Sequence, residues 1–259
     1  MKLGVAVNAY DGVELMERAI MSYRDVVDYV CIVYQTVSNF GEVDQTSAAV
    51  SRRLLASGVV DAIFEFDPKR KSGFHNELAK RNVGLNACRR AGCTHHLSAD
   101  VDEFYVASEL DIAKSAVLSN GSDASACQMI TYYGSGDWAF DPPEEYYVPL
   151  IYKIDPGRQF EMCMWQVQVD PTRRMRTQRT MLFDRKTVQM HHMSYVRNDI
   201  KKKLNNSSAR ANFKNRAADI ASAYAKWVPG ERAYVGRVED GMVNLIRVEN
   251  KFNIGKNGL

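Results

Sequence analysis

The 259-residue sequence contains no apolar run close to the roughly 18 residues that a membrane-spanning helix requires. Its amino terminus also lacks the charged, apolar and small-residue progression of a signal peptide. We therefore expect a soluble, cytoplasmic protein. Because 46% of the residues are hydrophobic and 25% are charged, the chain can bury a full core.

Cysteine and histidine are scarce, with five of each. The cysteine number is odd and no two have Cys-x-x-Cys spacing, which argues against both a disulfide framework and a zinc ribbon. One zinc centre stays open as an alternative, built from Cys93, one of His95 or His96, and one of His191 or His192. Adjacent residues of a strand face opposite sides, so at most one histidine of each pair can take part.

Internal repeats and low-complexity linkers are absent, and positive charge is concentrated in one segment. Residues 158–216 contain 14 lysines and arginines against four acids, a net charge of +10, and the remainder has a net charge of −7. This cationic segment includes the run Arg173, Arg174, Arg176 and Arg179. Such a run is typical of binding to a polyanion such as DNA, or to an anionic membrane surface. A non-catalytic nucleic-acid-binding protein is therefore one possible reading.

The first half of the chain alternates buried-strand patterns with amphipathic-helix patterns. Three strand–helix units in succession predict an α/β fold whose sheet is mostly parallel, with right-handed crossovers. The expected strands are Leu3–Val7, Tyr29–Tyr34, Val59–Phe66 and a strand that starts at His95, and the expected helices are 13–20, Thr46–Ser57 and Asn76–Arg90.

The second half predicts mixed or antiparallel strands, a helix and a hairpin. Ser108 and Asp111 have the spacing of a capping box for a short helix that ends near Gly121. A long acidic and aromatic loop, Gly134–Glu145, is of the kind that is often functional. The other expected elements are strands at Ala124–Tyr133, Val148–Ile154, Met162–Val169 and Val188–Val196, a helix at Ser207–Trp227 and a hairpin at Tyr234–Val248.

Carboxylates gather where the fourth strand ends. Asp100 and Asp102 are two residues apart, so in an extended backbone they point the same way and can share a hard cation such as Mg²⁺ or Mn²⁺. Ligands of parallel sheets collect outside the carboxyl ends of the strands. We therefore expect these acids to converge with Asn8, Tyr10, Gln35 and Asp67, which follow or end other strands.

Two stretches resemble the nucleotide-sugar glycosyltransferases of the GT-A fold, in particular family 2. The first is Arg81-Asn82-Val83-Gly84-Leu85 through Ala99-Asp100-Val101-Asp102-Glu103, which is similar to that superfamily's helix followed by a strand ending in Asp-x-Asp. The second is His192-Met193-Ser194-Tyr195, which looks like its late metal-binding histidine. The resemblance divides one compact domain into a donor-binding half, residues 1–106, and an acceptor-side half, residues 107–259.

The resemblance implies a metal-dependent hexosyltransferase that uses a nucleotide-diphosphate sugar, with a UDP-sugar as the expected donor. It implies that Asn8, Tyr10 and Asp67 contact the nucleoside and that Arg81 lies near the nucleoside or its phosphates. Asp100, Asp102 and His192 would hold Mn²⁺ or Mg²⁺.

The residues themselves add candidates for the rest of the reaction. Arg197 and the run of lysines at 201–203, of which Lys201 is the first, could add positive charge at the diphosphate. Asp137 and Asp141 are candidates for the base that accepts the acceptor's proton. The positive segment suggests that this acceptor is DNA or another polyanion. A nucleotidyltransferase is a further alternative, although residues 8–12 contain no lysine or arginine of the kind its glycine-rich loop carries.

Overall fold

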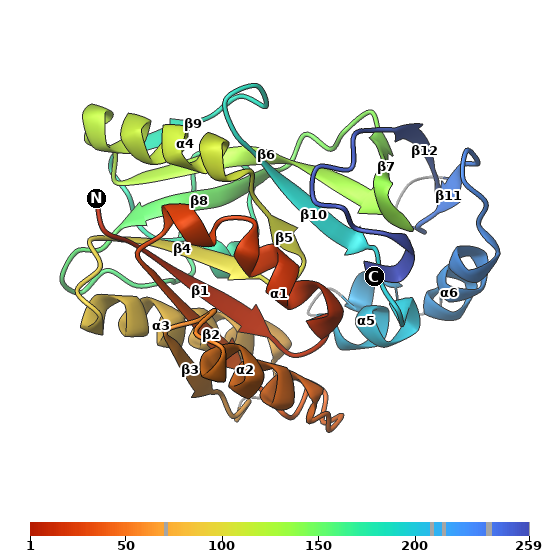
Figure 1. The fold of residues 1–259 in the computed structure, drawn as a ribbon, viewed down its shortest axis with the longest axis horizontal. Coiled ribbons are helices and arrows are strands. Elements are labelled where there is room, and N and C mark those ends of the chain that lie inside the picture. Colours follow the sequence, from red (N-terminus) through yellow and green to blue (C-terminus); the bar gives the residue numbers. More distant parts are fainter. Residues whose placement is uncertain (70–71, 208–209, 214–215, 237–239, 259) are drawn as a thin grey trace.

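The computed structural model describes residues 1–69, 72–207, 210–213, 216–236 and 240–258, and within them the strands form one large sheet (Figure 1). The strands are β1 (Leu3–Ala9), β2 (Tyr29–Tyr34), β3 (Ala62–Glu65), β4 (His95–Asp100), β5 (Glu103–Phe104), β6 (Ala124–Tyr133), β7 (Ser135–Asp141), β8 (Tyr147–Lys153), β9 (Thr180–Leu182), β10 (Gln189–Tyr195), β11 (Ala233–Tyr234) and β12 (Met242–Arg247). Their order is β11-β12-β7-β6-β8-β4-β1-β2-β3, while β10 pairs with β5 and β6, and β9 pairs with β6.

The helices pack on both faces of this sheet. They are α1 (Val13–Met21), α2 (Thr46–Ala56), α3 (Gly73–Arg90), α4 (Ala107–Asn120), α5 (Ile200–Asn206) and α6 (Ala217–Lys226), with 3₁₀ turns at Arg24–Val26, Pro171–Arg173, Arg210–Phe213 and Lys256–Gly258. Among the described residues, no helix is long and apolar enough to cross a membrane.

The four strands β3, β2, β1 and β4 are parallel neighbours, as the sequence predicts. The register places Asn8 of β1 beside Asp100 of β4, and Ala9 beside Tyr34 of β2. The carboxyl ends of these three strands therefore meet at one edge of the sheet.

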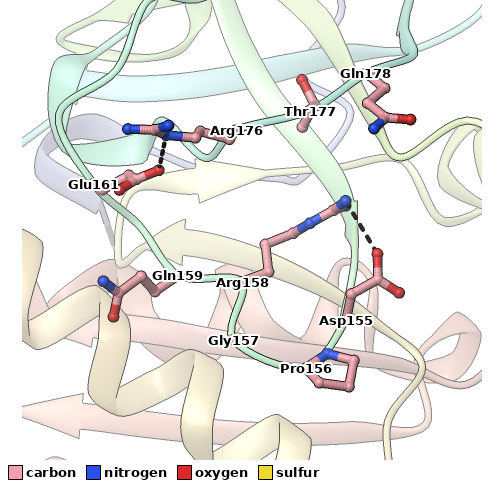
Figure 2. Close-up of a pocket in the computed structure, with 9 residues that line it drawn as sticks. All are labelled: Asp155, Pro156, Gly157, Arg158, Gln159, Glu161, Arg176, Thr177 and Gln178. Carbon is pink, nitrogen blue, oxygen red and sulfur yellow. Dashed lines mark ion pairs between the residues drawn. The ribbon is translucent and has the colours of Figure 1, made fainter.

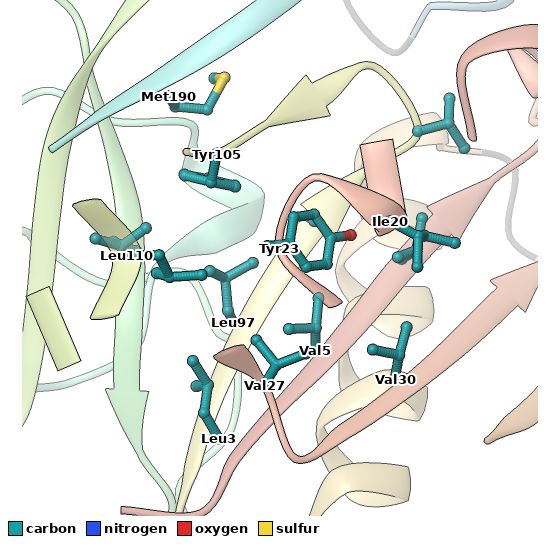
Figure 3. Packing of buried hydrophobic residues seen from close by; sticks show 14 of the residues in the cluster. Leu3, Val5, Ile20, Tyr23, Val27, Val30, Leu97, Tyr105, Leu110 and Met190 are labelled. Carbon is teal, nitrogen blue, oxygen red and sulfur yellow. The ribbon is translucent and has the colours of Figure 1, made fainter. Parts of the chain in front are cut away.

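Alternate residues of these strands supply two different cores. Val5 of β1 and Val30 of β2 belong to the larger core, which includes side chains of α1, α2 and α4 (Figure 3). Ala6 and Cys31, on the opposite face, pack instead with Cys88 of α3. Both faces of the parallel strands are thus buried, which explains why their sequences are continuous apolar runs rather than alternating ones.

Gly84 lets α3 lie directly against β1. A Cβ atom at this position would overlap the Cβ of Ala6 and also press against a methyl group of Val33. A glycine in mid-helix weakens the helix by roughly 1 kcal/mol relative to alanine, so this close approach explains its presence. It also fixes the distance of α3 from the sheet, and α3 carries Lys80 and Arg81 on its buried side.

Several expectations for the second half are wrong. Most of the expected loop at 134–145 is the strand β7, which pairs with β6 and β12. The adjacent residues Ala139 and Phe140 face opposite sides of this strand and are buried in two different clusters, which stabilises the strand. No strand forms at 162–169, where Arg174 donates to the carbonyls of Cys163 and Val169 and so takes the place of a neighbouring strand. The short strands β5 and β9 were not expected.

The predicted helix ends also differ. The N-cap of α4 is Val106 without a side-chain bond, so the expected capping box at Ser108 does not form. The single helix expected at 207–227 is wrong: α5 starts earlier, where Asp199 accepts a bond from the Lys202 amide, and ends at Asn206, and α6 follows. Residues 208, 209, 214 and 215 of that prediction lie outside the described residues. The hairpin is confirmed by the antiparallel pairing of β11 with β12, while residues 237–239 of that prediction lie outside the described residues.

We predict that Gly84→Ala destabilises the protein by about 1–3 kcal/mol, because the added methyl group overpacks the α3–β1 contact. The matched control is Gly73→Ala in the same helix, where a Cβ would meet its nearest atoms at 3.5 Å, an ordinary contact. Urea unfolding at equilibrium measures both. A Gly84→Ala variant as stable as the Gly73→Ala variant would contradict the packing argument.

Candidate active site

A cavity of about 240 Å³ opens at the edge where β1, β2 and β4 end. Polar and charged side chains from both halves of the chain line it, so it offers few contacts to an apolar ligand. The residues are Asn8, Tyr10, Asp11, Gln35, Asn39, Glu77, Lys80, Asp100, Val101, Asp102, His192, Ser194, Arg197, Lys203, Asn206 and Ser207.

The first strand contributes a polar wall, as the sequence predicts. The Asn8 side-chain amide donates to Ser98 Oγ at 3.2 Å and to the Ala99 carbonyl at 3.2 Å. Its Oδ1 atom is buried and has no hydrogen-bond partner among the described residues. Tyr10 donates its hydroxyl to the Glu42 carbonyl at 2.9 Å, which leaves its ring along the cavity. An unpartnered buried oxygen beside an aromatic ring is suited to receiving a polar ring ligand.

Asp100 is held by two buried arginines. Arg173 donates to Asp100 Oδ2 at 2.6 Å and also bonds Glu103, and Arg81 donates to the same Asp100 oxygen at 3.2 Å. Arg81 and Arg173 are 1% and 4% exposed, so their charges depend on these carboxylates for stabilisation. The other oxygen of Asp100, Oδ1, is buried without a partner among the described residues.

Asp102 has its own pair of cations. Lys203 Nζ donates to Asp102 Oδ2 at 2.8 Å, Arg197 bonds the same oxygen, and His192 Nε2 lies 3.5 Å from it. Gly12 permits the approach of Arg197, because a Cβ there would collide with the guanidinium, and its positive φ of 71° suits glycine. Asp100 and Asp102 therefore face one cavity but bind different cations.

Burial and charge set the ionisation of these groups. Burial opposes ionisation of Asp102, but Lys203 and Arg197 outweigh it and hold the pKa of Asp102 well below its usual range. The pKa of Asp100 is lowered in the same way by Arg81 and Arg173 against its burial. Burial lowers the pKa of Lys80 to about 8, since its Nζ donates only to the Ala9 carbonyl within the described structure.

The residues predicted to hold a metal share this cavity but are not arranged as a finished metal site. Among the described residues, no three histidine, cysteine or carboxylate side chains are placed to hold an ion together. Two carboxylates and an imidazole are nevertheless ligands that suit Mn²⁺ or Mg²⁺, and Asp100 Oδ1 and His192 Nδ1 are both buried and unpartnered in the described part of the chain. The donor set thus fits a divalent ion, provided that Asp102 releases its cations.

The two late histidines face opposite ways. His192 lines the cavity, whereas His191 is buried on the other face, where its Nδ1 lies 2.8 Å from the Tyr132 hydroxyl and its ring packs on Phe252. His96 lies at the far end of β4, 3.4 Å from Cys88 Sγ. The alternative zinc centre joining both ends of the strand does not form in the described residues.

Five predicted site residues do not line this cavity, and the first of them is Arg81, which is buried and donates to Asp100. The Asp67 side chain is 72% exposed and pairs with Lys69, and Lys201 is exposed on α5. Asp137 accepts a bond from Ser135 within β7, and Asp141, at the exposed end of that strand, lines a different cavity. Lys203, two residues after Lys201, is the lysine of that run that enters the site.

Arg173 belongs to the basic run that suggests polyanion binding, and no sequence pattern singles out Lys80. Arg173 follows Asp170 and Pro171, which cap and start the 3₁₀ turn that points it inward. Lys80 is a charged residue directly before Arg81, on a helix whose buried side also contains Gly84. A charge on the buried face of a helix was the signal that could have identified it.

A separate concave region, away from this cavity and shown in Figure 2, is lined by Arg158 and Arg176. Both arginines are paired, Arg158 with Asp155 at 3.0 Å and Arg176 with Glu161 at 2.6 Å. This region begins just after β8, and in the sheet Lys153 of β8 lies opposite His95 at the start of β4. This region is therefore at the opposite end of β4 from Asp100, and its arginines are already neutralised.

No family model and no curated protein matches the sequence. Among solved structures, the chain is similar to residues 1–349 of S. aureus TarS, with 14% identity over 86% of this chain and 70% of that chain, and a TM-score of 0.46. A longer TarS structure gives 14% identity over 86% and 42%, with a TM-score of 0.48. A structure of GalNAc-T7 with UDP, GalNAc and Mn²⁺ gives 11% identity over 51% and 24%, with a TM-score of 0.38. Similarity at this level does not by itself assign an activity to this chain.

We predict that Lys80→Met stabilises the protein at pH 7 by up to about 3 kcal/mol, the free energy that corresponds to lowering the lysine pKa from 10.5 to about 8. Between pH 8 and 10.5 the unfolded state binds more protons at this lysine, so wild-type stability rises with pH and the gain shrinks. Denaturant unfolding of both proteins at pH 7 and pH 9.5 measures this. A gain that does not shrink with pH would contradict the assigned burial cost.

Proposed function

We propose that the protein is a glycosyltransferase that moves a sugar from a nucleotide-diphosphate sugar to an acceptor hydroxyl. The observation that carries the proposal is the convergence of Lys80, Arg197 and Lys203 with Asp100 and Asp102 in one cavity. This cavity lies outside the carboxyl ends of parallel strands, where sheets of this type bind their ligands. Cations that can hold a diphosphate stand there beside carboxylates that can hold a metal.

The polar wall and the cations suggest how the donor binds. Asn8, Tyr10 and Gln35 would contact the nucleoside, since their amides and ring offer hydrogen bonds and a stacking surface. Lys80, Arg197 and Lys203 would contact the diphosphate. Arg81 is fully buried behind Asp100, so its role is to orient that carboxylate rather than to touch the donor.

The charge balance supports a metal that arrives together with the donor. The charged side chains in and directly behind the cavity are the cations Lys80, Arg81, Arg173, Arg197 and Lys203 and the acids Asp11, Glu77, Asp100, Asp102, Glu103 and Asp170. Because the acids outnumber the cations, the site has no spare positive charge for a diphosphate. Asp100, Asp102 and His192 would hold the divalent ion, which supplies neutralisation of the leaving diphosphate as a Lewis acid.

The same residues imply an exchange of partners. Arg197 and Lys203 bind Asp102 in the described structure, and a diphosphate offers them a second anion. If Arg197 and Lys203 turn to the diphosphate, the Asp102 Oδ2 atom becomes available to a metal ion. Donor and metal should therefore strengthen each other's binding.

The predicted polyanionic acceptor loses part of its basis, because much of the positive segment is paired internally. The ion pairs are Arg158 with Asp155, Arg173 with Glu103, Arg176 with Glu161, Arg197 with Asp102, Lys202 with Asp44 and Lys203 with Asp102. These pairs involve six of the 14 cations of the segment, and three acids of the first half, Asp44, Asp102 and Glu103, pair with four of those six. A small or neutral acceptor is more consistent with this pairing than a DNA duplex.

We predict that Lys203→Met weakens UDP binding by about 10–100-fold, because it removes a charged hydrogen-bond donor worth about 1.5–3 kcal/mol. Lys201→Met, at the exposed neighbouring position, is the matched control and should bind UDP like the wild type. Isothermal titration calorimetry with UDP measures both. Equal losses in the two variants would mean that the lysine run acts only through its overall charge.

We predict that hydrolysis of nucleotide sugars requires a divalent ion, and that Mn²⁺ binds more tightly when UDP is present. The assay measures nucleotide release from UDP-glucose, UDP-galactose, UDP-GlcNAc and GDP-mannose, with Mn²⁺ or with excess chelator. Asp102→Asn should lose both the hydrolysis and the coupling between Mn²⁺ and UDP. Full hydrolysis by the wild type in chelator would show that the basic side chains alone neutralise the diphosphate.

A further inference from the structure

A second cavity, of about 550 Å³, adjoins the first and shares Asp100 and His192 with it. The side chains that line it differ in kind from those of the first cavity. Aromatic side chains, Phe74, Tyr146 and Tyr147, form part of its wall, and the carboxylates of Glu144 and Asp170 also line it. Asp137 and Asp141, the bases that the sequence suggested, are not among its lining residues.

The strand register brings Glu144 close to His192, which lines both cavities. His192 of β10 is opposite Glu103 of β5 and beside Thr131 of β6, so these three side chains project from one face of the sheet. The Thr131 hydroxyl donates to the Glu144 carboxylate. Glu144 is thus tied to the strand position next to His192, although it comes from the segment between β7 and β8.

The charge of this second cavity excludes anions. Its arginine, Arg173, is committed to Asp100 and Glu103. Glu144 makes no ion pair within the described part of the chain, because the nearby Arg185 donates instead to the carbonyls of Met129 and Glu144. A carboxylate that makes no ion pair, beside a committed cation, repels phosphate and carboxylate groups and attracts hydroxyl donors.

The aromatic side chains indicate a ring-bearing ligand. Flat aromatic faces pack against the apolar face of a ring, while carboxylates at the edge accept hydrogen bonds from its hydroxyl groups. Together with the negative charge, this combination describes a site for an uncharged saccharide.

We propose that this second cavity is the acceptor site, that it takes an uncharged saccharide, and that Glu144 is the general base. The proposal rests on the proposed function. Glu144 accepts the proton of an acceptor hydroxyl, and the hydroxyl oxygen forms a bond to the anomeric carbon of the donor sugar. The bond from that carbon to the diphosphate breaks, and its electron pair leaves with the diphosphate. Glu144 then loses the proton to water, and this single displacement inverts the anomeric carbon.

The test compares Glu144→Gln with Glu145→Gln, its exposed neighbour that lines neither cavity. Two rates are measured: release of nucleotide from the nucleotide sugar to water, and transfer to the methyl glycosides of glucose, galactose, mannose and GlcNAc. Glu144→Gln should lower both rates by about 10²–10⁴-fold, and Glu145→Gln should leave them unchanged. UDP affinity should be unchanged in both variants.

A positioning variant and a pH profile separate a base from a structural role. Thr131→Val removes the hydroxyl that orients Glu144 and should lower the rate less than Glu144→Gln, with UDP affinity intact. The acid limb of the wild-type pH–rate profile should disappear in Glu144→Gln. Glu144→Gln rates equal to those of Glu145→Gln would overturn the assignment of the base.

The acceptor class is tested with the UDP-bound protein, by saturation-transfer NMR with the same methyl glycosides, glucose 6-phosphate, glucuronic acid and a DNA duplex. The uncharged glycosides should bind and their anionic counterparts should not. Preferred binding of an anionic probe, or no binding of any uncharged glycoside, would overturn the acceptor proposal. If UDP and GDP themselves fail to bind, the proposed function fails first, and the two failures are thereby distinguished.

Discussion

The structure around the candidate active site depends on one buried ionic network, in which Arg173 bridges Asp100 and Glu103 and Arg81 supports Asp100 from α3. These four side chains join the end of β4, the start of β5, a helix of the first half and a 3₁₀ turn of the second. Removing one partner from a buried pair typically costs 3–5 kcal/mol, because the other charge stays buried and unpaired. The network therefore fixes the carboxyl edge of β4 and holds the two halves of the chain in one arrangement.

That network also separates two environments that meet at Asp100 and His192. On one side, cations and amides form a polar cavity that suits a nucleotide and its phosphates. On the other side, aromatic rings and the carboxylate of Glu144, which makes no ion pair in the described part of the chain, help to form a cavity that suits an uncharged hydroxyl-bearing ring. A reaction between two bound molecules requires such neighbouring sites, since holding both reactants in place lowers the entropic part of the barrier.

The sequence predicted the parallel strands and their helices because their patterns are local. Leu3–Val7 and Tyr29–Tyr34 are continuous apolar runs, and a strand that ends at Asp100, with Asp102 two residues on, places both acids at the same edge in any parallel sheet. The chemistry at Asp102 could not be predicted in this way. Arg197 and Lys203 reach it from 95 and 101 residues away, and nothing in local periodicity indicates such a pairing.

The errors have physical causes of the same kind. The segment at 134–141 contains two glycines and two aspartates, which favour a loop, yet β6 and β12 supply partners on both sides and make it a strand. The positions of Arg173 and Arg174 were equally hidden from the sequence, since both belong to a basic run yet point inward, one to carboxylates and the other to backbone carbonyls. Glu144 could be recognised only after the pairing of β6 with β10 was known.

The most direct test of this account is a crystal structure of the protein with UDP and Mn²⁺. We predict that the diphosphate lies within hydrogen-bond distance of Lys80, Arg197 and Lys203, with the ion between it and the carboxylates of Asp100 and Asp102. UDP bound elsewhere, for example between Arg158 and Arg176 at the other end of β4, with the Asp102 ion pairs unchanged, would contradict the central claim that the cavity at the carboxyl edge is the donor site.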